Sequence, residues 1–203
     1  MKLPSIVLLS VLCCAHAGAA SPADGSVEEG QAKSATCVAC HGANGNSPNP
    51  EWPNIAGQHE QYIFKQLQAF KAGERQNPLM TPIAQTLSED DMADLAVFYS
   101  QQTATGLETA ADKVEQGQRL YRGGDAENQI AACTGCHGPR GKGNPTALYP
   151  AIQGQHATYV AAQLRAYRAG TRQTDQNQIM RDVARTMSDA QIEAVAAYVQ
   201  GLR

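Results

Sequence analysis

Two short motifs hold the residues best suited to chemistry in this 203-residue sequence. Residues 37–42 read CVACHG and residues 133–138 read CTGCHG. Two cysteines separated by two residues and followed by histidine form the attachment signature of covalent haem. The thiols add to the two vinyl groups of the porphyrin, and the adjacent histidine supplies an axial nitrogen to the iron. The predicted attachment residues are Cys37, Cys40, Cys133 and Cys136, and the predicted axial histidines are His41 and His137.

Other uses of these four cysteines are weaker alternatives. An exported chain with four cysteines is normally expected to form two disulfides, but a two-residue spacing makes a tight ring. A tetrahedral zinc site built from all four thiolates would leave the adjacent histidines without a role. Thioredoxin-like redox chemistry requires a βαβ setting, and no alternating strand pattern is present. The paired motifs therefore favour haem.

The first 20 residues are typical of a secretory signal. Lys2 provides a basic start, residues 6–14 are apolar but too short to span a bilayer, and small residues follow at 15–20. A retained membrane anchor is the alternative. We expect cleavage of residues 1–20 and a periplasmic location for the mature chain.

The remaining sequence is two copies of one unit. The motif recurs after 96 residues, and residues 53–59 (PNIAGQH) recur 97 residues later as PAIQGQH. We predict an N-terminal domain at 21–102, a linker at 103–111 and a C-terminal domain at 112–203. Copy two has nine extra residues before its motif, which we expect to form a loop.

The apolar spacing predicts an all-α fold. One helix should precede each motif, around residues 27–35 and 112–121. A second should follow each Gly-Gln-His segment, and a third should begin at Ser88 or Ser188, each a good N-cap.

Superposing the two copies indicates the second axial ligand of each iron. Met92 and Met187 face aliphatic residues in the other copy, so they are expected to fill the core. Met80 and Met180 align with each other. Each lies in a loop between two helices, where a thioether can reach an iron. The sequence therefore predicts Met80 and Met180 as ligands.

His59 and His156 are the rival ligands, because they also match between the copies. They stand at the start of a helix, where a packing or hydrogen-bonding role is favoured. With histidine and methionine on both irons, no position is open for oxygen or peroxide. The pattern predicts an electron carrier that has no catalytic residue, with a small dihaem peroxidase and a haem subunit of a larger oxidase or dehydrogenase as alternatives.

The chain resembles the cytochrome c4 family of dihaem proteins along its whole mature length. Besides the two motifs, the resemblance lies in FKAG at 70–73, PLM at 78–80, LYRGG at 120–124 and YPAIQGQH at 149–156. It implies two tandem class I cytochrome c domains related by a pseudo-twofold axis, with two covalently attached haem c groups near their interface. It also implies single-electron transfer in a respiratory chain, from a bc1-type reductase to a terminal oxidase, often near the membrane surface.

The resemblance also assigns supporting residues. The carbonyls of Pro53 and Pro150 would accept the imidazole N–H of the axial histidines. Copy two lacks the family's proline two residues before its methionine and has Gln178 there, so a looser loop is expected. Trp52 and Tyr149 face each other in the alignment and could reach a haem propionate or simply pack.

Charge differs between the two halves. Residues 21–106 hold ten acids and four bases, a net of −6, whereas residues 107–203 hold nine acids and eleven bases, a net of +2. We expect the resulting dipole to orient the protein toward its partners, with Arg165, Arg168 and Arg172 on the basic side. Neither nucleic acid nor a small-molecule substrate is expected as a partner.

Overall fold

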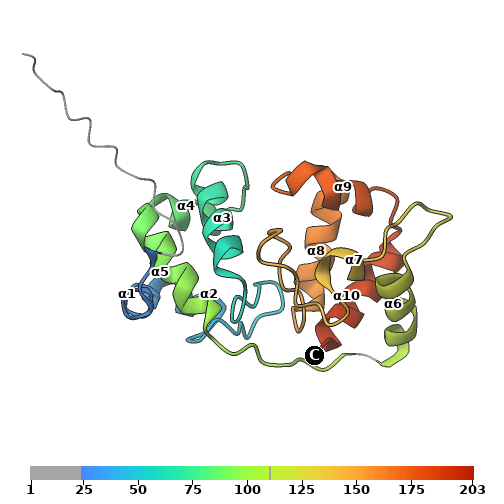
Figure 1. Ribbon diagram of the computed structural model, residues 1–203, viewed down its shortest axis with the longest axis horizontal. Helices are drawn as coiled ribbons and strands as arrows, with labels where there is room; N and C mark the ends of the chain where they lie inside the picture. Colours follow the sequence, from blue (N-terminus) through green and yellow to red (C-terminus); the bar gives the residue numbers. More distant parts are fainter. Residues whose placement is uncertain (1–23, 110) are drawn as a thin grey trace, which may run out of the picture.

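The computed structural model describes residues 24–109 and 111–203, which fold into two helical domains side by side (Figure 1). Within those ranges there is no strand, only isolated bridges between Asp125 and Ile130 and between Asn144 and Tyr149. The predicted all-α class is confirmed. The predicted signal peptide lies outside the described residues.

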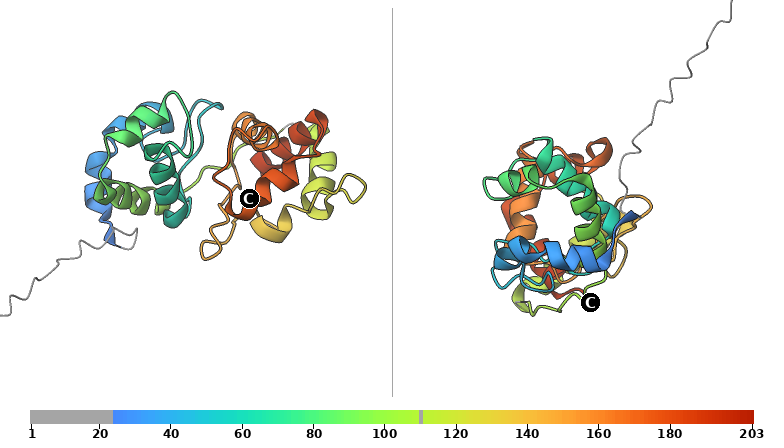
Figure 2. Two further views of the ribbon diagram at one scale, coloured as in Figure 1. Left: turned by 90° about the horizontal axis from the view of Figure 1, so that it is seen from above. Right: turned by 90° about the vertical axis from the view of Figure 1, so that its left-hand side faces the viewer.

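Each domain repeats the same order of helices around its own core. The N-terminal domain contains α1 (Val27–Lys33), α2 (Ala35–His41), α3 (Glu60–Lys71), α4 (Met80–Gln85) and α5 (Glu89–Ser100). The C-terminal domain contains α6 (Ala111–Gly123), α7 (Thr134–His137), α8 (Ala157–Arg168), the 3-10 turn η2 (Gln176–Gln178), α9 (Ile179–Ala184) and α10 (Asp189–Gly201). Seen from above, the two domains remain separate lobes (Figure 2).

The last helix of each domain starts where the sequence predicts. The Ser88 hydroxyl accepts a hydrogen bond from the Asp91 amide at 3.0 Å, and Ser188 accepts one from Gln191 at 3.2 Å. The Asp91 and Gln191 side chains bond back to the capping amides, so both are complete capping boxes. These caps fix the start of α5 and α10, which form the centre of each core.

Close helix crossings hold the first helix of each domain against the last. A Cβ added to Gly30 would lie 2.2 Å from the Asp94 carbonyl oxygen, and one added to Gly117 would lie 2.1 Å from the Ala194 oxygen. Only glycine allows α1 to approach α5, and α6 to approach α10, at this separation.

Two expected elements differ from the structure. The helix expected at 27–35 ends at Lys33, and a new helix, α2, starts after Ser34 and carries the first motif. The methionines predicted to lie in loops stand at the beginning of the short helices α4 and α9. Both helices have only six residues, too short for the apolar spacing to reveal. The extra residues of copy two do form a loop, 124–133, between α6 and α7.

The segment between the domains is attached to both of them: Thr109 and Glu108 bond to Ala197 and Gln200 of α10, and earlier residues bond to the N-terminal domain. Asn46 donates to the Thr103 carbonyl at 2.9 Å and accepts from the Thr105 amide at 2.8 Å. These bonds restrict the first part of the predicted linker, 103–111. No helix among the described residues is long and apolar enough to cross a bilayer.

The domains contact each other through reciprocal hydrogen bonds. The Gln58 side chain donates to the Ala151 oxygen at 2.7 Å and accepts from the Ala151 amide at 2.9 Å. Gln155 does the same with Asn54, at 2.8 and 2.9 Å. Gln155 and Ala151 each stand 97 positions after Gln58 and Asn54, so the contacts have pseudo-twofold symmetry.

Candidate functional site

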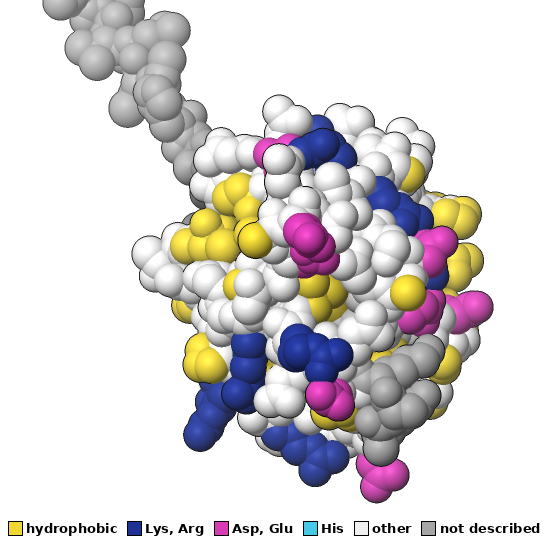
Figure 3. All heavy atoms as spheres, turned by 90° about the vertical axis from the view of Figure 1, so that its right-hand side faces the viewer, with side chains coloured by type: hydrophobic (Ala, Val, Ile, Leu, Met, Phe, Trp, Pro, Cys, Tyr) yellow, Lys and Arg dark blue, Asp and Glu magenta, His cyan; other side chains and the backbone are white. Residues whose placement is uncertain are grey.

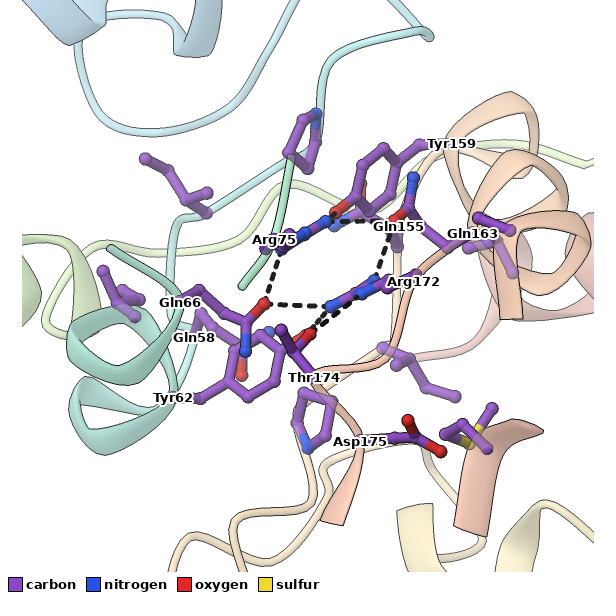
Figure 4. A pocket seen from close by; sticks show the side chains of 18 of the residues that line it. Gln58, Tyr62, Gln66, Arg75, Gln155, Tyr159, Gln163, Arg172, Thr174 and Asp175 are labelled. Carbon is purple, nitrogen blue, oxygen red and sulfur yellow. Dashed lines mark hydrogen bonds between the residues drawn. The ribbon is translucent and has the colours of Figure 1, made fainter. Parts of the chain in front are cut away.

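One large cavity of about 840 Å³ runs through both domains (Figure 4). It is enclosed by α3, α4 and α5 in the first domain and by their counterparts α8, α9 and α10 in the second. Its walls are mostly aliphatic and aromatic, which suits a large apolar group. The predicted site residues all line it: Cys37, Cys40, His41, Met80, Cys133, Cys136, His137 and Met180.

The two motif histidines have the same geometry. His41 Nδ1 lies 2.9 Å from the Pro53 carbonyl oxygen, and His137 Nδ1 lies 2.9 Å from that of Pro150. A carbonyl oxygen only accepts, so Nδ1 carries the proton and Nε2 keeps a free lone pair for a metal. Burial lowers the pKa of both imidazoles, although the hydrogen bond to the proline carbonyl opposes the shift. Both rings are therefore neutral imidazoles held in one orientation.

The motif cysteines line the cavity beside these histidines. Burial raises the pKa of the Cys37 thiol, and it raises that of Cys133 to about 11. Among the described residues no group of three or more His, Cys, Asp or Glu side chains is arranged to hold a metal ion. The four-cysteine zinc site considered above is therefore wrong.

Different hydrogen bonds fix the backbone beside each of the two methionines. In the first domain the Asn77 side chain accepts hydrogen bonds from the amides of Leu79 and Met80, both at 2.9 Å. In the second domain the Asp175 carboxylate accepts from the Arg181 amide at 3.0 Å and from its Nε at 2.8 Å. A neutral amide in one half is thus replaced by an ion pair in the other.

The absence of proline in the second methionine loop has a visible effect on the backbone. Asn177 and Gln178 both adopt positive φ, 52° and 62°. Residues other than glycine, asparagine and aspartate rarely adopt this left-handed conformation. This loop turns sharply, and Asp175 ties it to Arg181.

The rival histidines lie elsewhere. Neither His59 nor His156 is among the described residues that line the cavity. His59 Nε2 donates to the Lys142 oxygen at 2.8 Å, and His156 Nε2 donates to the Ser47 oxygen at 2.9 Å, both in the other domain. The predicted hydrogen-bonding role of these residues is confirmed.

Trp52 and Tyr149 both line the cavity, as their alignment suggested. Sequence reasoning did not single out Arg75, Gln66 and Gln163, which also line it. The signal was present, because Gln66 and Gln163 match at the 97-residue offset.

The three arginines named for the charge asymmetry differ in their burial and in their partners. Arg172 is buried at 6% exposure, Arg165 pairs with Glu193 at 2.6 Å, and Arg168 pairs with Asp189 at 2.7 Å. The outer end of the C-terminal domain carries both charge signs interspersed (Figure 3). These three residues therefore do not form a single basic patch.

The site suits covalently attached haem in both halves. Each half brings together two thiols, a neutral imidazole with a free Nε2 and a thioether on the wall of one apolar cavity. The profile of the cytochrome c family matches residues 27–102 and 114–203, one match per domain. Cytochrome c4 of Pseudomonas aeruginosa is 43% identical over 197 residues, covering 97% of this chain and 98% of that protein. The chain belongs to the cytochrome c4 family.

Further similarities agree with this membership. The crystal structure of reduced recombinant cytochrome c4 from Pseudomonas stutzeri matches with a TM-score of 0.86 at 43% identity, covering 88% of this chain and all of that one. A protein named thiosulfate dehydrogenase electron acceptor, from Thiomonas intermedia, is 39% identical over 202 residues, covering 96% of this chain and 91% of that protein. As in cytochrome c4, this chain is a dihaem electron-transfer cytochrome with two covalent haem c groups, one per CxxCH motif.

Proposed function

We propose that the protein carries single electrons in the periplasm, with His41 and Met80 holding one haem iron and His137 and Met180 holding the other. The observation that carries this proposal is the shared cavity wall, which includes both methionines and excludes both rival histidines among the described residues. Bound haem supplies an iron that cycles between the ferrous and ferric states. The chain supplies the axial ligands, orients each imidazole through a proline carbonyl and surrounds the haem with apolar side chains.

Filled axial positions favour a carrier over an enzyme. Oxygen or peroxide activation requires an open iron position, and the proposed ligand set leaves none. A soft thioether stabilises ferrous iron and raises the reduction potential relative to a second histidine. The proposed ligands thus suit a respiratory electron carrier and argue against a dihaem peroxidase.

Methionine substitution tests the ligand assignment. Met80→Ala is expected to remove the near-infrared methionine–iron band of the N-terminal haem alone, and Met180→Ala that of the C-terminal haem alone. Met92→Leu is the matched control, because Met92 is fully buried in the core away from the cavity wall. Absence of the band from the wild-type protein, together with a change to a high-spin ferric spectrum in His59→Ala or His156→Ala, would reverse the assignment.

For partners, we infer a bc1-type reductase as donor and a terminal oxidase as acceptor, with peripheral association at the membrane surface. This inference comes from family membership. The net charges of −6 and +2 in the two halves support different partners for different domains. A free carrier should show donor oxidation rates that fall with ionic strength.

A second donor is favoured by one observation. The relative from Thiomonas intermedia is named for accepting electrons from thiosulfate dehydrogenase, and it matches nearly the whole chain. A sulfur-compound dehydrogenase is therefore the alternative donor. Comparing reduction rates with a purified bc1-type complex and with thiosulfate dehydrogenase decides between the two, since the physiological donor should be faster by orders of magnitude.

A further inference from the structure

Two arginines and two glutamines form a closed ring across the domain interface (Figure 4). Gln66 Oε1 accepts from Arg75 at 2.7 Å and from Arg172 at 3.1 Å. Gln163 Oε1 accepts from Arg75 at 3.0 Å and from Arg172 at 2.8 Å. Each glutamine oxygen therefore bridges two guanidinium groups, one from each domain.

Tyrosine hydroxyls extend the ring with the same crossed pattern. Arg75 donates to Tyr159 of the C-terminal domain at 2.9 Å, and Arg172 donates to Tyr62 of the N-terminal domain at 2.8 Å. Each arginine belongs to one domain and bonds to a tyrosine and a glutamine of the other. The pairs match at the 97-residue offset, so the ring has the same pseudo-twofold symmetry as the interface.

Each guanidinium also stacks on an aromatic ring. Arg75 stacks over Phe70 with 4.6 Å to the ring centroid, and Arg172 stacks over Tyr167 at 4.7 Å. Each of these aromatics belongs to the arginine's own domain. A guanidinium fixed between its own aromatic and the other domain's side chains has little freedom to turn toward water.

The ring holds two positive charges without a matching negative charge. Arg172 is only 6% exposed, and Arg75 is partly buried. Within the described residues neither guanidinium forms an ion pair with a carboxylate, and Asp175 nearby in sequence pairs with Arg181. Two adjacent buried cations with neutral partners are costly, so an anion is needed to balance them.

The cavity identifies the anion. Arg75 and Arg172 line the same cavity as both cysteine motifs and both axial histidines. The groups that occupy this cavity are haems, and each haem carries two propionate carboxylates. Guanidinium is the side chain best matched to a carboxylate. The shared chemistry of the ring is therefore carboxylate or small-anion binding between two haem sites.

We propose that Arg75 and Arg172 together act as a shared counter-ion for the propionates of both haems, so that either arginine influences both reduction potentials. The proposal rests on the presence of two haems and is independent of the ligand and partner assignments above. A positive charge near a haem favours the ferrous over the ferric form. Because the ring spans the interface, the loss of one charge affects the haem of the other domain as well.

The test measures both reduction potentials by spectroelectrochemistry on the purified dihaem protein. Arg172→Gln should lower both potentials, with the ferrous-to-ferric ratio at a fixed solution potential falling about tenfold, equivalent to about 59 mV for a one-electron couple. Arg75→Gln should do the same to a smaller extent, since Arg75 is more exposed. Arg172→Lys should restore most of the loss, because it keeps the charge.

Arg165→Gln is the matched control, since Arg165 lies on α8 with its own acidic partner Glu193. It should leave both potentials unchanged. A shift confined to the haem of the mutated domain, or no shift in either arginine variant, would overturn the proposal and leave the ring a purely structural clamp. Arg75→Gln provides the same reading should Arg172→Gln fail to assemble.

A second arm distinguishes propionates from a solvent anion. Wild-type potentials are measured in chloride and in phosphate at constant ionic strength. Propionate counter-ions predict equal values in both buffers. A dependence on phosphate that disappears in Arg172→Gln would assign the ring to a free anion and refute the propionate role. Methionine–iron bands monitored in parallel separate this result from failure of the axial assignment.

Discussion

At the scale of single residues, the two halves hold equivalent methionines by unlike means. Asn77 uses one side-chain oxygen to accept from two consecutive amides at the start of α4. Asp175 uses both oxygens on one arginine, and its loop adopts left-handed backbone at two residues. The rigidity of each sulfur position therefore depends on a different neighbour.

Removal of the Asn77 amide should loosen the Met80 sulfur. We expect Asn77→Ala to destabilise the methionine-bound state by about 1 kcal/mol, because two backbone N–H groups lose their hydrogen-bond acceptor. This loss should raise the apparent affinity of exogenous imidazole for the ferric N-terminal haem about fivefold. Optical imidazole titration measures it. Asn177→Gly is the control, since it removes the equivalent amide and suits the left-handed backbone; equal weakening in both variants would contradict the role of Asn77.

The residue types at the site could be predicted from the sequence, because covalent haem attachment requires a specific pattern of cysteine and histidine. Two CxxCH motifs and repeat-matched methionines leave few alternatives. The supporting residues could not be predicted, because Asn77 aligns with Asn177, which does not take its role, and Asp175 lies in the three-residue insertion of copy two, where it has no counterpart. Their function depends on which amide each side chain reaches in three dimensions.

At the scale of helices, each domain depends on one close crossing. Gly30 in α1 and Gly117 in α6 face carbonyl oxygens of the last helix at distances that exclude a side chain. The apolar spacing and the serine caps predicted the helices. They did not predict the close crossing, because a single glycine in a helix can equally well be exposed to solvent. The short helices α4 and α9 also lie below the length at which spacing is informative.

Alanine at these glycines should destabilise one domain at a time. We expect Gly30→Ala to lower the free energy of unfolding of the N-terminal domain, and Gly117→Ala that of the C-terminal domain, each by about 1–3 kcal/mol from overpacking. Denaturant unfolding followed at each haem measures the effect. Gly123→Ala, on the same helix as Gly117 with nothing within 4 Å of the added carbon, should be neutral or stabilising. A loss as large in Gly123→Ala would contradict the crossing as the cause.

At the scale of the whole molecule, reciprocal hydrogen bonds from polar side chains join the domains. Gln58 and Gln155 are each about 8% exposed, and each pairs with both backbone groups of one residue across the interface. The repeat in the sequence predicted two similar domains. It could not predict how they face each other, because glutamine and histidine are also common on free surfaces.

Removal of both glutamines should separate the domains without unfolding them. Gln58→Ala with Gln155→Ala leaves four backbone groups without partners, at about 1–3 kcal/mol for each group that stays buried. We expect a larger radius of gyration by small-angle scattering and two resolved calorimetric transitions. Gln173→Ala, an exposed glutamine with a local bond only, should change neither. An unaltered scattering profile in the double variant would show that other contacts suffice.

The reciprocal interface has a consequence for how such a molecule could arise. A surface on which each half offers the other the same residues is self-complementary, as in a twofold homodimer. Two identical one-haem units could associate through it before any gene fusion joined them. The covalent connection then replaces a bimolecular encounter by an intramolecular one at high effective concentration. The pair of redox centres accordingly stays assembled however far the protein is diluted.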